Sequence, residues 1–374
     1  MLKKILILTS EHAGHGHKSV ANALESGFVN HADISTFAVN GFALAGSIGL
    51  AFERLYTPSV KYFPTGWHWF FNLTSNHARG TNKVAAFMIK RRLVKLIAET
   101  KPDLILSTNS VFVGSIINVL REKELSVPFY AVLTDIISLS KTWFDARTDL
   151  TFSPSDNATA VMLKSGICAD KIITLGFPVR SGFYTHIRSS DELAVSQSGK
   201  VKFLIVNGSY KARSLIDIID RLLSDYPCHV TFISGRDKQV RSRLERHYSR
   251  TKNITVLGFS DDMGSHLRKN DILLTRCGAN ILMEAINCLI PIVSLGTIPG
   301  QESQNPDFIE SYGFGKKTNG IDDIFAKIDE LLDSDRKLLR QIRQNQFNYA
   351  GRNATEKTIF HIIDSYERFC SEGK

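Results

Sequence analysis

Short apolar runs alternate with longer stretches of helical periodicity along most of the chain. Continuous apolar runs predict strands that are buried on both faces. We expect strands at residues 4–8, 104–107, 129–134, 149–152, 172–176, 203–206, 230–233, 254–257, 271–275 and 292–295. We expect helices from about Ser19 and over residues 116–124, 155–165, 212–223, 238–248, 264–269, 281–286 and 353–369. Strands that alternate with helices in this way predict parallel sheets and an α/β fold.

The chain is long enough for two such units. Its 374 residues exceed what one hydrophobic core usually holds. Residues 189–200 are polar and poor in large apolar side chains, which is typical of a linker. We therefore expect an N-terminal domain over residues 1–186, a second domain over 200–350, and a last segment, 351–374, whose helix packs back toward the first domain. Each domain begins with a strand, a glycine-containing loop and a helix, the opening of a doubly wound fold.

The stretch from Thr275 to Asn305 combines a strand end, a tight loop, a helix, a second strand and a polar loop. Gly278 and Ala279 predict a turn into the helix, so free backbone N–H groups would meet an anion there. Glu284 lies in the first turns of that helix, where a carboxylate can reach the hydroxyls of a sugar attached to a bound phosphate. Pro291 is expected to end the helix. These features predict a phosphorylated sugar ligand or a nucleotide.

Composition narrows the class of protein. The chain has 43% hydrophobic and 22% charged residues and a formal charge of +9, so nucleic acid, anionic lipid and phosphorylated substrates are all possible partners. Its five cysteines are scattered and never spaced Cys-x-x-Cys, which argues against a disulfide framework and a zinc site and favours a reducing cytosol. The first apolar run is too short for a signal peptide, and no run approaches the roughly 20 apolar residues of a spanning helix. Histidines at 12, 15 and 17 lack recognisable further metal ligands, so we expect no metal.

Residues 41–75 are rich in aromatic side chains, and the next stretch, 79–101, is strongly basic. Aromatic rings beside a cationic amphipathic helix suit an interfacial membrane anchor, in which Trp67, Trp69, Arg91 and Arg92 would meet anionic lipid. The alternative is a core-packing helix with a solvated basic side and a second small aromatic core. The sequence leaves both interpretations open. A nucleic-acid interface is not expected, because no recognised nucleic-acid motif accompanies the cations.

Several short motifs occur in order along the chain. They are Gly14-His15-Gly16-His17-Lys18-Ser19, Leu133-Thr134-Asp135 with Trp143, Gly176-Phe177-Pro178-Val179-Arg180, Gly258-Phe259, Thr275-Arg276-x-Gly278, Glu284-Ala285 and Pro299-Gly300-Gln301-Glu302-x-x-Asn305. Together they resemble the glycosyltransferase family that contains monogalactosyldiacylglycerol synthase and the processive diacylglycerol glucosyltransferases. The lipid-linked N-acetylglucosaminyltransferase of peptidoglycan synthesis is a further member of this group. The resemblance runs through most of the chain.

The resemblance implies an inverting glycosyltransferase of the B-type fold, in which two Rossmann-like α/β domains face a cleft. It implies a UDP-sugar donor, a membrane lipid acceptor such as diacylglycerol, an anionic membrane surface as partner, no metal or other cofactor, and a peripheral place on the inner face of the cell membrane. By position, His17 is the candidate base, and Asp135 is a further catalytic candidate that could instead cap or support the acceptor side. The implied donor-binding residues are Gly16, Gly208, Ser209, Phe259, Met263, Arg276, Gly278, Ala279, Asn280, Glu284, Gln301, Glu302 and Asn305.

Within that set the resemblance implies separate tasks. Glu284 would bind the ribose, the amides after Arg276 the diphosphate, and residues 301, 302 and 305 the sugar or the adjoining phosphate. Phe259 and Met263 would border the uracil. Two alternatives remain: transfer to a soluble or polyprenyl-linked acceptor, and a non-catalytic nucleotide-sugar-binding protein. The second alternative is motivated by departures from the family pattern, namely Ser140 in place of a histidine and Ala279 in place of a glycine.

Overall fold

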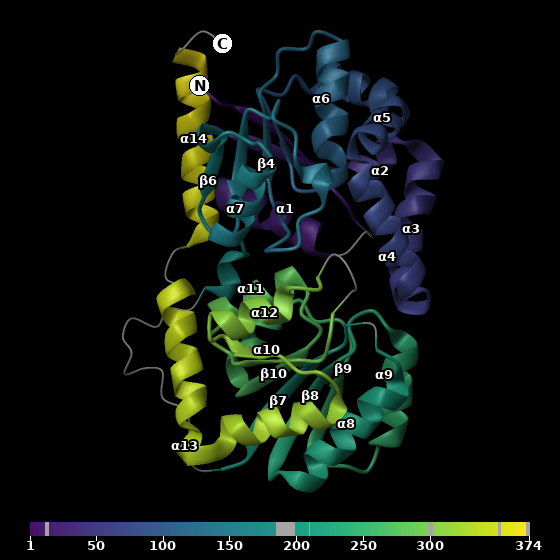
Figure 1. Ribbon diagram of the computed structural model, residues 1–374, viewed down its shortest axis with the longest axis vertical. Helices are drawn as coiled ribbons and strands as arrows, with labels where there is room; N and C mark the ends of the chain where they lie inside the picture. The colour runs from purple at the N-terminus through teal and green to yellow at the C-terminus, as the bar shows by residue number, and fades with distance from the viewer. Residues whose placement is uncertain (12–14, 185–198, 209, 298–301, 351–352, 372–374) are drawn as a thin grey trace. The chain divides into compact units, whose positions relative to one another are not determined.

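The computed structural model describes residues 1–11, 15–184, 199–208, 210–297, 302–350 and 353–371 (Figure 1). The chain forms two compact units. The first contains Met1–Ser181, Glu302 and helix α14 (Ala354–Ser371), and the second contains the described residues from Gly182 to the end of helix α13 (Ile321–Ala350) except Glu302. Each unit is an α/β domain built on its own parallel sheet, as the alternation of strands and helices predicted.

The sheet of the first unit has six parallel strands in the order β2-β1-β3-β4-β5-β6. The strands are β1 (Lys4–Thr9), β2 (Ser35–Asn40), β3 (Leu104–Ser107), β4 (Phe129–Val132), β5 (Leu150–Ser153) and β6 (Ile172–Thr174). Helices α1 (His15–Phe28), α6 (Val113–Glu122) and α7 (Asp156–Lys164) connect strands of this sheet. The central strands β1, β3, β4 and β5 are almost completely buried, because helices cover both faces of a parallel sheet.

A group of four helices extends the first unit between β2 and β3. They are α2 (Gly41–Leu44), α3 (Gly46–Tyr62), α4 (Pro64–Asn76) and α5 (Ala78–Thr100). Helix α5 places Ile89, Leu93 and Ile97 in the core against α6, as the apolar spacing of this helix predicted. Figure 1 shows α3 and α4 at the margin of the unit.

The sheet of the second unit also has six parallel strands, in the order β12-β11-β10-β7-β8-β9. The strands are β7 (Val201–Val206), β8 (Cys228–Ile233), β9 (Ile254–Leu257), β10 (Ile272–Thr275), β11 (Ile292–Ser294) and β12 (Gly315–Lys316). The helices, besides α13, are α8 (Ala212–Asp225), α9 (Lys238–His247), α10 (Met263–Lys269), α11 (Ala279–Asn287) and α12 (Asn305–Ser311). Phe203, Phe232 and Leu215 are fully buried in its core.

Strand order locates where each sheet can bind a ligand. In the first sheet the chain moves outward from β1 in both directions, so the crevice between β1 and β3 is the switch point. In the second sheet the corresponding crevice lies between β7 and β10. Ligands of open α/β sheets bind outside the carboxyl ends of the strands at such a point. Each unit therefore offers one expected site.

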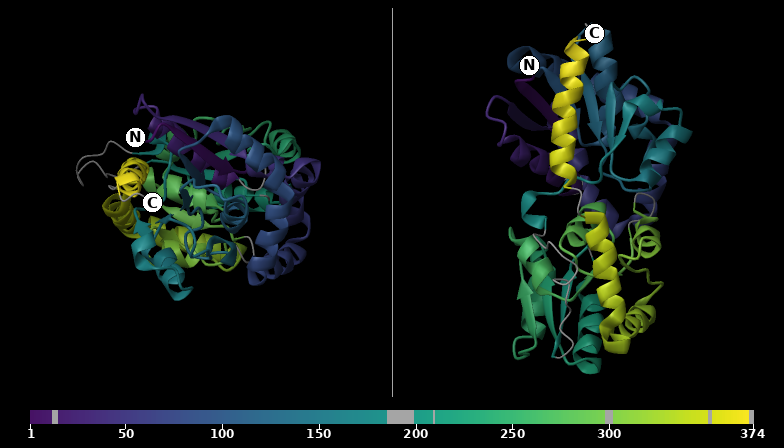
Figure 2. Two further views of the ribbon diagram at one scale, coloured as in Figure 1. Left: turned by 90° about the horizontal axis from the view of Figure 1, so that it is seen from above. Right: turned by 90° about the vertical axis from the view of Figure 1, so that its left-hand side faces the viewer.

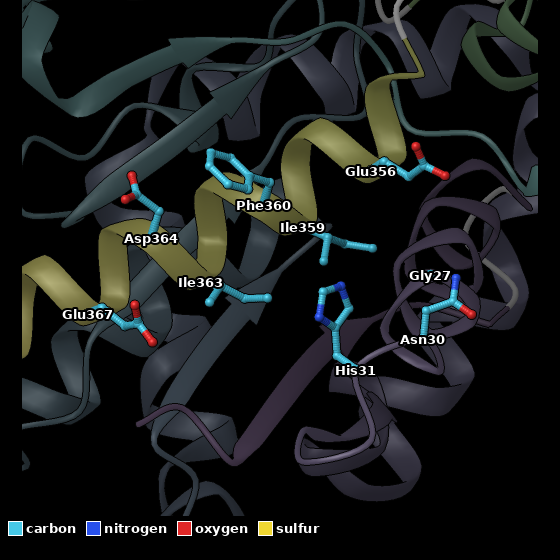
Figure 3. Close-up of a pocket in the computed structure, with 9 residues that line it drawn as sticks. All are labelled: Gly27, Asn30, His31, Glu356, Ile359, Phe360, Ile363, Asp364 and Glu367. Carbon is cyan, nitrogen blue, oxygen red and sulfur yellow. The ribbon is translucent and has the colours of Figure 1, made fainter.

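Helix α14 returns to the first unit, where it packs against α1 (Figure 2). Thr355 Oγ1 donates a hydrogen bond to the Val179 carbonyl oxygen at 2.7 Å. A cavity of about 450 Å³ lies beside α14. Figure 3 shows residues that line it, among them Ile359, Phe360 and His31. The cavity adjoins the C-terminal end of α1. Because α1 runs back from the carboxyl end of β1, the cavity lies toward the amino ends of the strands, away from the switch point.

The structure differs from the predicted elements in several places. Helices α2, α3, α4, α12 and α13 and the short strand β12 were not predicted. Strand β2 was not predicted, because it is an edge strand with partly exposed residues and lacks a continuous apolar run. Helix α1 begins at His15 rather than near Ser19. Helix α11 ends at Asn287, where Leu289 takes a left-handed φ of 58°, so the helix stops before Pro291. The predicted linker 189–200 lies almost entirely outside the described residues.

Candidate functional site

His17 lies at the switch point of the first sheet, in the first turn of α1. Its Nδ1 is 2.8 Å from the carbonyl oxygen of Thr108, which directly follows β3. The same nitrogen is 2.7 Å from Oγ1 of Thr134, which follows β4. Thr108 Oγ1 in turn donates to the His17 carbonyl oxygen at 3.1 Å. Residues at the ends of two neighbouring strands therefore hold the imidazole in one orientation.

These contacts determine which ring nitrogen carries the proton. A carbonyl oxygen can only accept, so Nδ1 carries the hydrogen that it donates to Thr108, and Nε2 keeps a lone pair. Burial lowers the pKa of His17 from 6.5 to about 4, and the hydrogen bond to the Thr108 backbone opposes this shift only in part. His17 is therefore a neutral imidazole near pH 7, with Nε2 as its proton acceptor.

Asp135 lies next to Thr134 but contacts a different part of the unit. Its carboxylate is buried and accepts a hydrogen bond from Trp143 Nε1 at 2.7 Å. Ser140, at the position of the family histidine, is also buried, and its Oγ lies 2.8 Å from Thr142 Oγ1. Asp135 therefore supports the buried indole of Trp143 by satisfying its N–H group. A catalytic role for Asp135 stays a prediction.

The switch point of the second sheet lies between the loops that follow β7 and β10. Arg276 Nη1 donates to the Gly208 carbonyl oxygen at 2.7 Å. A Cβ atom on Gly208 would lie 2.5 Å from Arg276 Cβ, so glycine is required for this approach. Gly278 is the N-cap of α11, and the helix begins at Ala279. The first amides of α11 therefore point toward the switch point, where they stabilise negative charge.

Glu284 is a buried carboxylate on α11, with 4% of its surface exposed. Asn280, one turn closer to the helix start, donates from Nδ2 to Glu284 Oε1 at 2.7 Å. A carboxylate at this height fits hydroxyl groups of a ribose whose phosphate meets the helix amides. Arg276 and Gly278 thus lie in the loop after β10 and Glu284 in the helix that follows it, and their roles in donor binding stay predictions.

The remaining donor-binding candidates are spread more widely. Asn305, the first residue of α12, is buried and donates from Nδ2 to the Cys277 carbonyl oxygen at 2.7 Å, so it supports the loop after β10. Phe259 follows β9 and is 55% exposed, and the Arg236 guanidinium lies 5.0 Å from its ring centroid. Met263 begins α10 and is half-buried. Phe259 follows the outer strand β9, whereas α10, the helix that begins at Met263, contacts the central strand β7.

Gly16 and Glu302 are placed as half-buried residues, Gly16 in α1 beside His17 and Glu302 shortly before α12. Ser209 and Gln301 lie outside the described residues. For these four, as for every other donor-binding candidate, the role in donor binding stays a prediction.

Two residues of these sites were missed in the sequence. Thr108 orients His17 from 91 positions away, and the only local signal is a polar residue directly after a buried strand. Tyr210 links the loops after β7 and β11, because its hydroxyl donates to the Leu295 carbonyl oxygen at 2.6 Å. The only sequence feature that could have pointed to Tyr210 is its place as an aromatic residue in the glycine-containing loop after β7.

The four predicted membrane residues differ in their surroundings. Trp67 is half-buried and packs edge-on against Tyr56, with ring centroids 4.8 Å apart. Trp69 is 66% exposed, and Arg91 is also exposed. Arg92 Nη1 lies 3.4 Å from each of the last two carbonyl oxygens of α2. Arg92 therefore caps α2 while it also remains exposed, like Trp69 and Arg91.

Large exposed apolar side chains gather on α3–α5 and the junction between α3 and α4. We call this set the apolar surface: Ile48, Phe52, Leu55, Tyr62, Phe63, Trp69, Leu73, Val84 and Phe87. Phe42 and Phe112 pack inside the core with centroids 5.0 Å apart, so part of the aromatic segment forms core and part remains exposed. Among the described helices, none is long and apolar enough to cross a bilayer.

Comparisons with known proteins agree along both units. Residues 17–179 match the family model of monogalactosyldiacylglycerol synthase, and residues 203–306 match that of the glycosyltransferase family 28 C-terminal domain. A processive diacylglycerol beta-glucosyltransferase of Bacillus cytotoxicus is 25% identical over 358 residues, covering 90% of this chain and 87% of the relative. The enzyme of that name from Bacillus cereus is 24% identical, with coverage of 97% and 92%.

Solved structures share the fold. MnaA of S. aureus, in complex with UDP, has a TM-score of 0.63 at 17% identity, with 96% of each chain covered. MurG of Acinetobacter baumannii has a TM-score of 0.61 at 14% identity, with coverage of 98% and 99%. Two parallel-sheet α/β domains of the glycosyltransferase B type are thus the architecture of this chain.

Proposed function

The chain is a glycosyltransferase of the diacylglycerol glycosyltransferase family, and from this premise we propose that it transfers a hexose from a UDP-sugar to diacylglycerol at a membrane surface. The observation that carries the proposal is the state of His17. Its Nδ1–H is engaged by Thr108, burial keeps the ring neutral, and Nε2 remains as a base.

The chemistry is a single displacement. The acceptor hydroxyl oxygen attacks the anomeric carbon of the sugar, and its proton passes to Nε2 of His17. The bond from the anomeric carbon to the phosphate oxygen breaks, and UDP leaves with the electron pair. One displacement inverts the anomeric configuration.

The leaving group gains negative charge as that bond breaks. The amides at the start of α11, with Arg276 close by, support stabilisation of this charge. Glu284 would hold the ribose hydroxyls. Relatives of known structure include complexes with UDP and with UDP-GlcNAc, which supports a uridine nucleotide as the donor.

The apolar surface supports a peripheral membrane location. Its rings lie beside the exposed cations Arg79, Lys83 and Arg91, and rings beside cations favour an interface with anionic lipid. We place the enzyme on the cytoplasmic face of the membrane, with an anionic lipid surface and diacylglycerol as its partners.

Activity is tested with purified protein, liposomes containing diacylglycerol and a panel of UDP-sugars, with mass spectrometry of the lipid. We expect one hexosyl-diacylglycerol product, and His17→Ala should lower kcat by about 100- to 10,000-fold while UDP binding is retained. A fully active His17→Ala variant would exclude the base assignment. Product formed only on a soluble or polyprenyl acceptor would exclude diacylglycerol.

Donor binding is tested separately by calorimetry. Glu284→Ala should weaken UDP binding about tenfold or more, because the buried carboxylate is lost and Asn280 loses its partner. Unchanged affinity for UDP would contradict the ribose contact.

Membrane binding has a matched control pair. Phe87, 79% exposed, belongs to the apolar surface, and Phe360, 65% exposed, lies on α14. Phe87→Ser should reduce co-sedimentation with anionic vesicles, and Phe360→Ser should leave it unchanged. Equal effects of the two substitutions would contradict the proposed docking surface.

A further inference from the structure

Glu53 is a fully buried carboxylate on α3, a helix that otherwise carries exposed apolar residues. Its exposed fraction is 0%, whereas Phe52 and Leu55 beside it are 43% and 61% exposed. Ionisable side chains are rarely fully buried unless partners satisfy them. Glu53 therefore needs an explanation that the packing of α3 does not supply.

Two hydrogen-bond donors from the strand ends meet this carboxylate. The backbone N–H of Glu11, two residues after β1, donates to Oε1 at 2.5 Å. Asn40, the last residue of β2, donates from Nδ2 to Oε2 at 2.8 Å. Because both partners are donors, only a group with two acceptor oxygens satisfies them together. A glutamine at position 53 would turn an NH₂ group toward one donor.

The two donors belong to the base of the loop that leads to His17. Asn40 pairs with Thr9 across β1 and β2, and Thr9 Oγ1 lies 3.0 Å from Oγ1 of Thr108, the residue that orients His17. The Glu11 side chain also accepts from Lys18, the neighbour of His17, at 3.2 Å. That exposed ion pair contributes little on its own. The buried carboxylate of Glu53 is thus the firmer attachment.

We infer that Glu53 is a positioning residue for glycosyl transfer: it ties Glu11 and Asn40, at the ends of β1 and β2, to the helix that carries part of the apolar surface, and through Thr9 and Thr108 it holds His17. The inference rests on the proposed role of His17 as the base. It assigns the carboxylate a task in orienting the base, not in binding donor or acceptor.

The test uses a hydrogen-bond swap. Glu53→Gln leaves an NH₂ group facing the Asn40 NH₂. Adding Asn40→Asp restores a donor–acceptor pair, retains the oxygen that caps α2 at Phe42 and returns the net charge to its original value. Glu25→Gln is the matched control, because Glu25 accepts a single backbone N–H, from Ala38, which a glutamine oxygen can still accept.

For Glu53→Gln we expect kcat to fall by as much as about 100-fold, the scale of a misplaced catalytic group, with the KM for the donor unchanged. The double variant should recover most of kcat, and the Glu25→Gln control should match the wild type. Wild-type kcat in Glu53→Gln would overturn the inference, as would a double variant no more active than the single one.

A second readout does not depend on turnover. Amide hydrogen exchange in the peptide spanning residues 10–24 should accelerate in Glu53→Gln and return toward wild type in the double variant, with exchange in the second unit unchanged. Exchange that is equal in all variants would overturn the inference. Should the wild type transfer no sugar at all, the proposed function fails, and the exchange measurement still decides whether Glu53 orders this loop.

Discussion

The protonation of His17 gives a quantitative prediction for the pH dependence of activity. Burial lowers its pKa from 6.5 to about 4. A base with that pKa is still about 97% neutral at pH 5.5, whereas an unperturbed histidine would be only about 9% neutral. Between pH 7.5 and 5.5, kcat/KM should therefore change little on account of His17, instead of falling about tenfold.

The assay is the initial rate of lipid glycosylation at donor concentrations below KM, because kcat/KM reports the free enzyme. The rate of His17→Gln is subtracted at each pH as background. An acid limb with a midpoint near 6.5, absent from His17→Gln, would refute the assignment of a neutral base with a lowered pKa.

The same shift predicts how stability depends on pH. Because the folded-state pKa lies below the unfolded value, the unfolded chain binds more protons between these values. The contribution of His17 is therefore present above pH 6.5 and is lost as the pH falls toward 4. Urea titrations at pH 7 and pH 5 should differ by about 2 kcal/mol more in the wild type than in His17→Gln. Equal pH dependence in the two proteins would contradict the shift.

Two further predictions concern packing at the two sites. Gly208→Ala should weaken UDP binding about tenfold or more in calorimetry, because the alanine Cβ would press on Arg276. The control Gly182→Ala should bind UDP like the wild type, because its Cβ would meet no atom within 4 Å. Equal affinities of the two variants for UDP would refute the close approach of Gly208 and Arg276. Trp143→Phe should destabilise the first unit by about 1–3 kcal/mol in urea unfolding, because Asp135 loses its indole partner, and an unchanged midpoint would argue against that bond as a support.

The sequence was informative where a local pattern determines the structure. Ten of the strands were predicted from continuous apolar runs, because parallel strands that are buried on both faces need such runs. The loop at Gly278 was predicted because a small residue precedes a stretch with helical periodicity. Edge strand β2 escaped because it is only partly covered. Strands that are buried on both faces were thus predictable from their apolar runs, and a partly covered strand was not.

Side-chain pairing across the chain could not be predicted in the same way. Thr108 meets His17 and Glu53 meets Glu11 because the fold brings helices α1 and α3 to the carboxyl ends of β3 and β1, which are distant in the sequence. Glu53 was hidden among the aromatic residues of its segment, where one acid carries no periodic signal. The contact of Arg92 with the end of α2 was not predicted either, because it joins residues 48 and 49 positions apart; the place of Arg92 at a membrane surface stays a prediction.

Helix α14 completes the first unit although it follows the second unit in the chain. Its Ile359 packs against Gly27 so closely that a Cβ on Gly27 would lie within 2.3 Å of the isoleucine side chain. During synthesis the first unit must therefore wait for the whole second unit to emerge, on the order of ten seconds or more at ribosomal speed. Until then the surface of α1 that α14 covers stays open, so this surface is a place where a chaperone could bind the nascent chain.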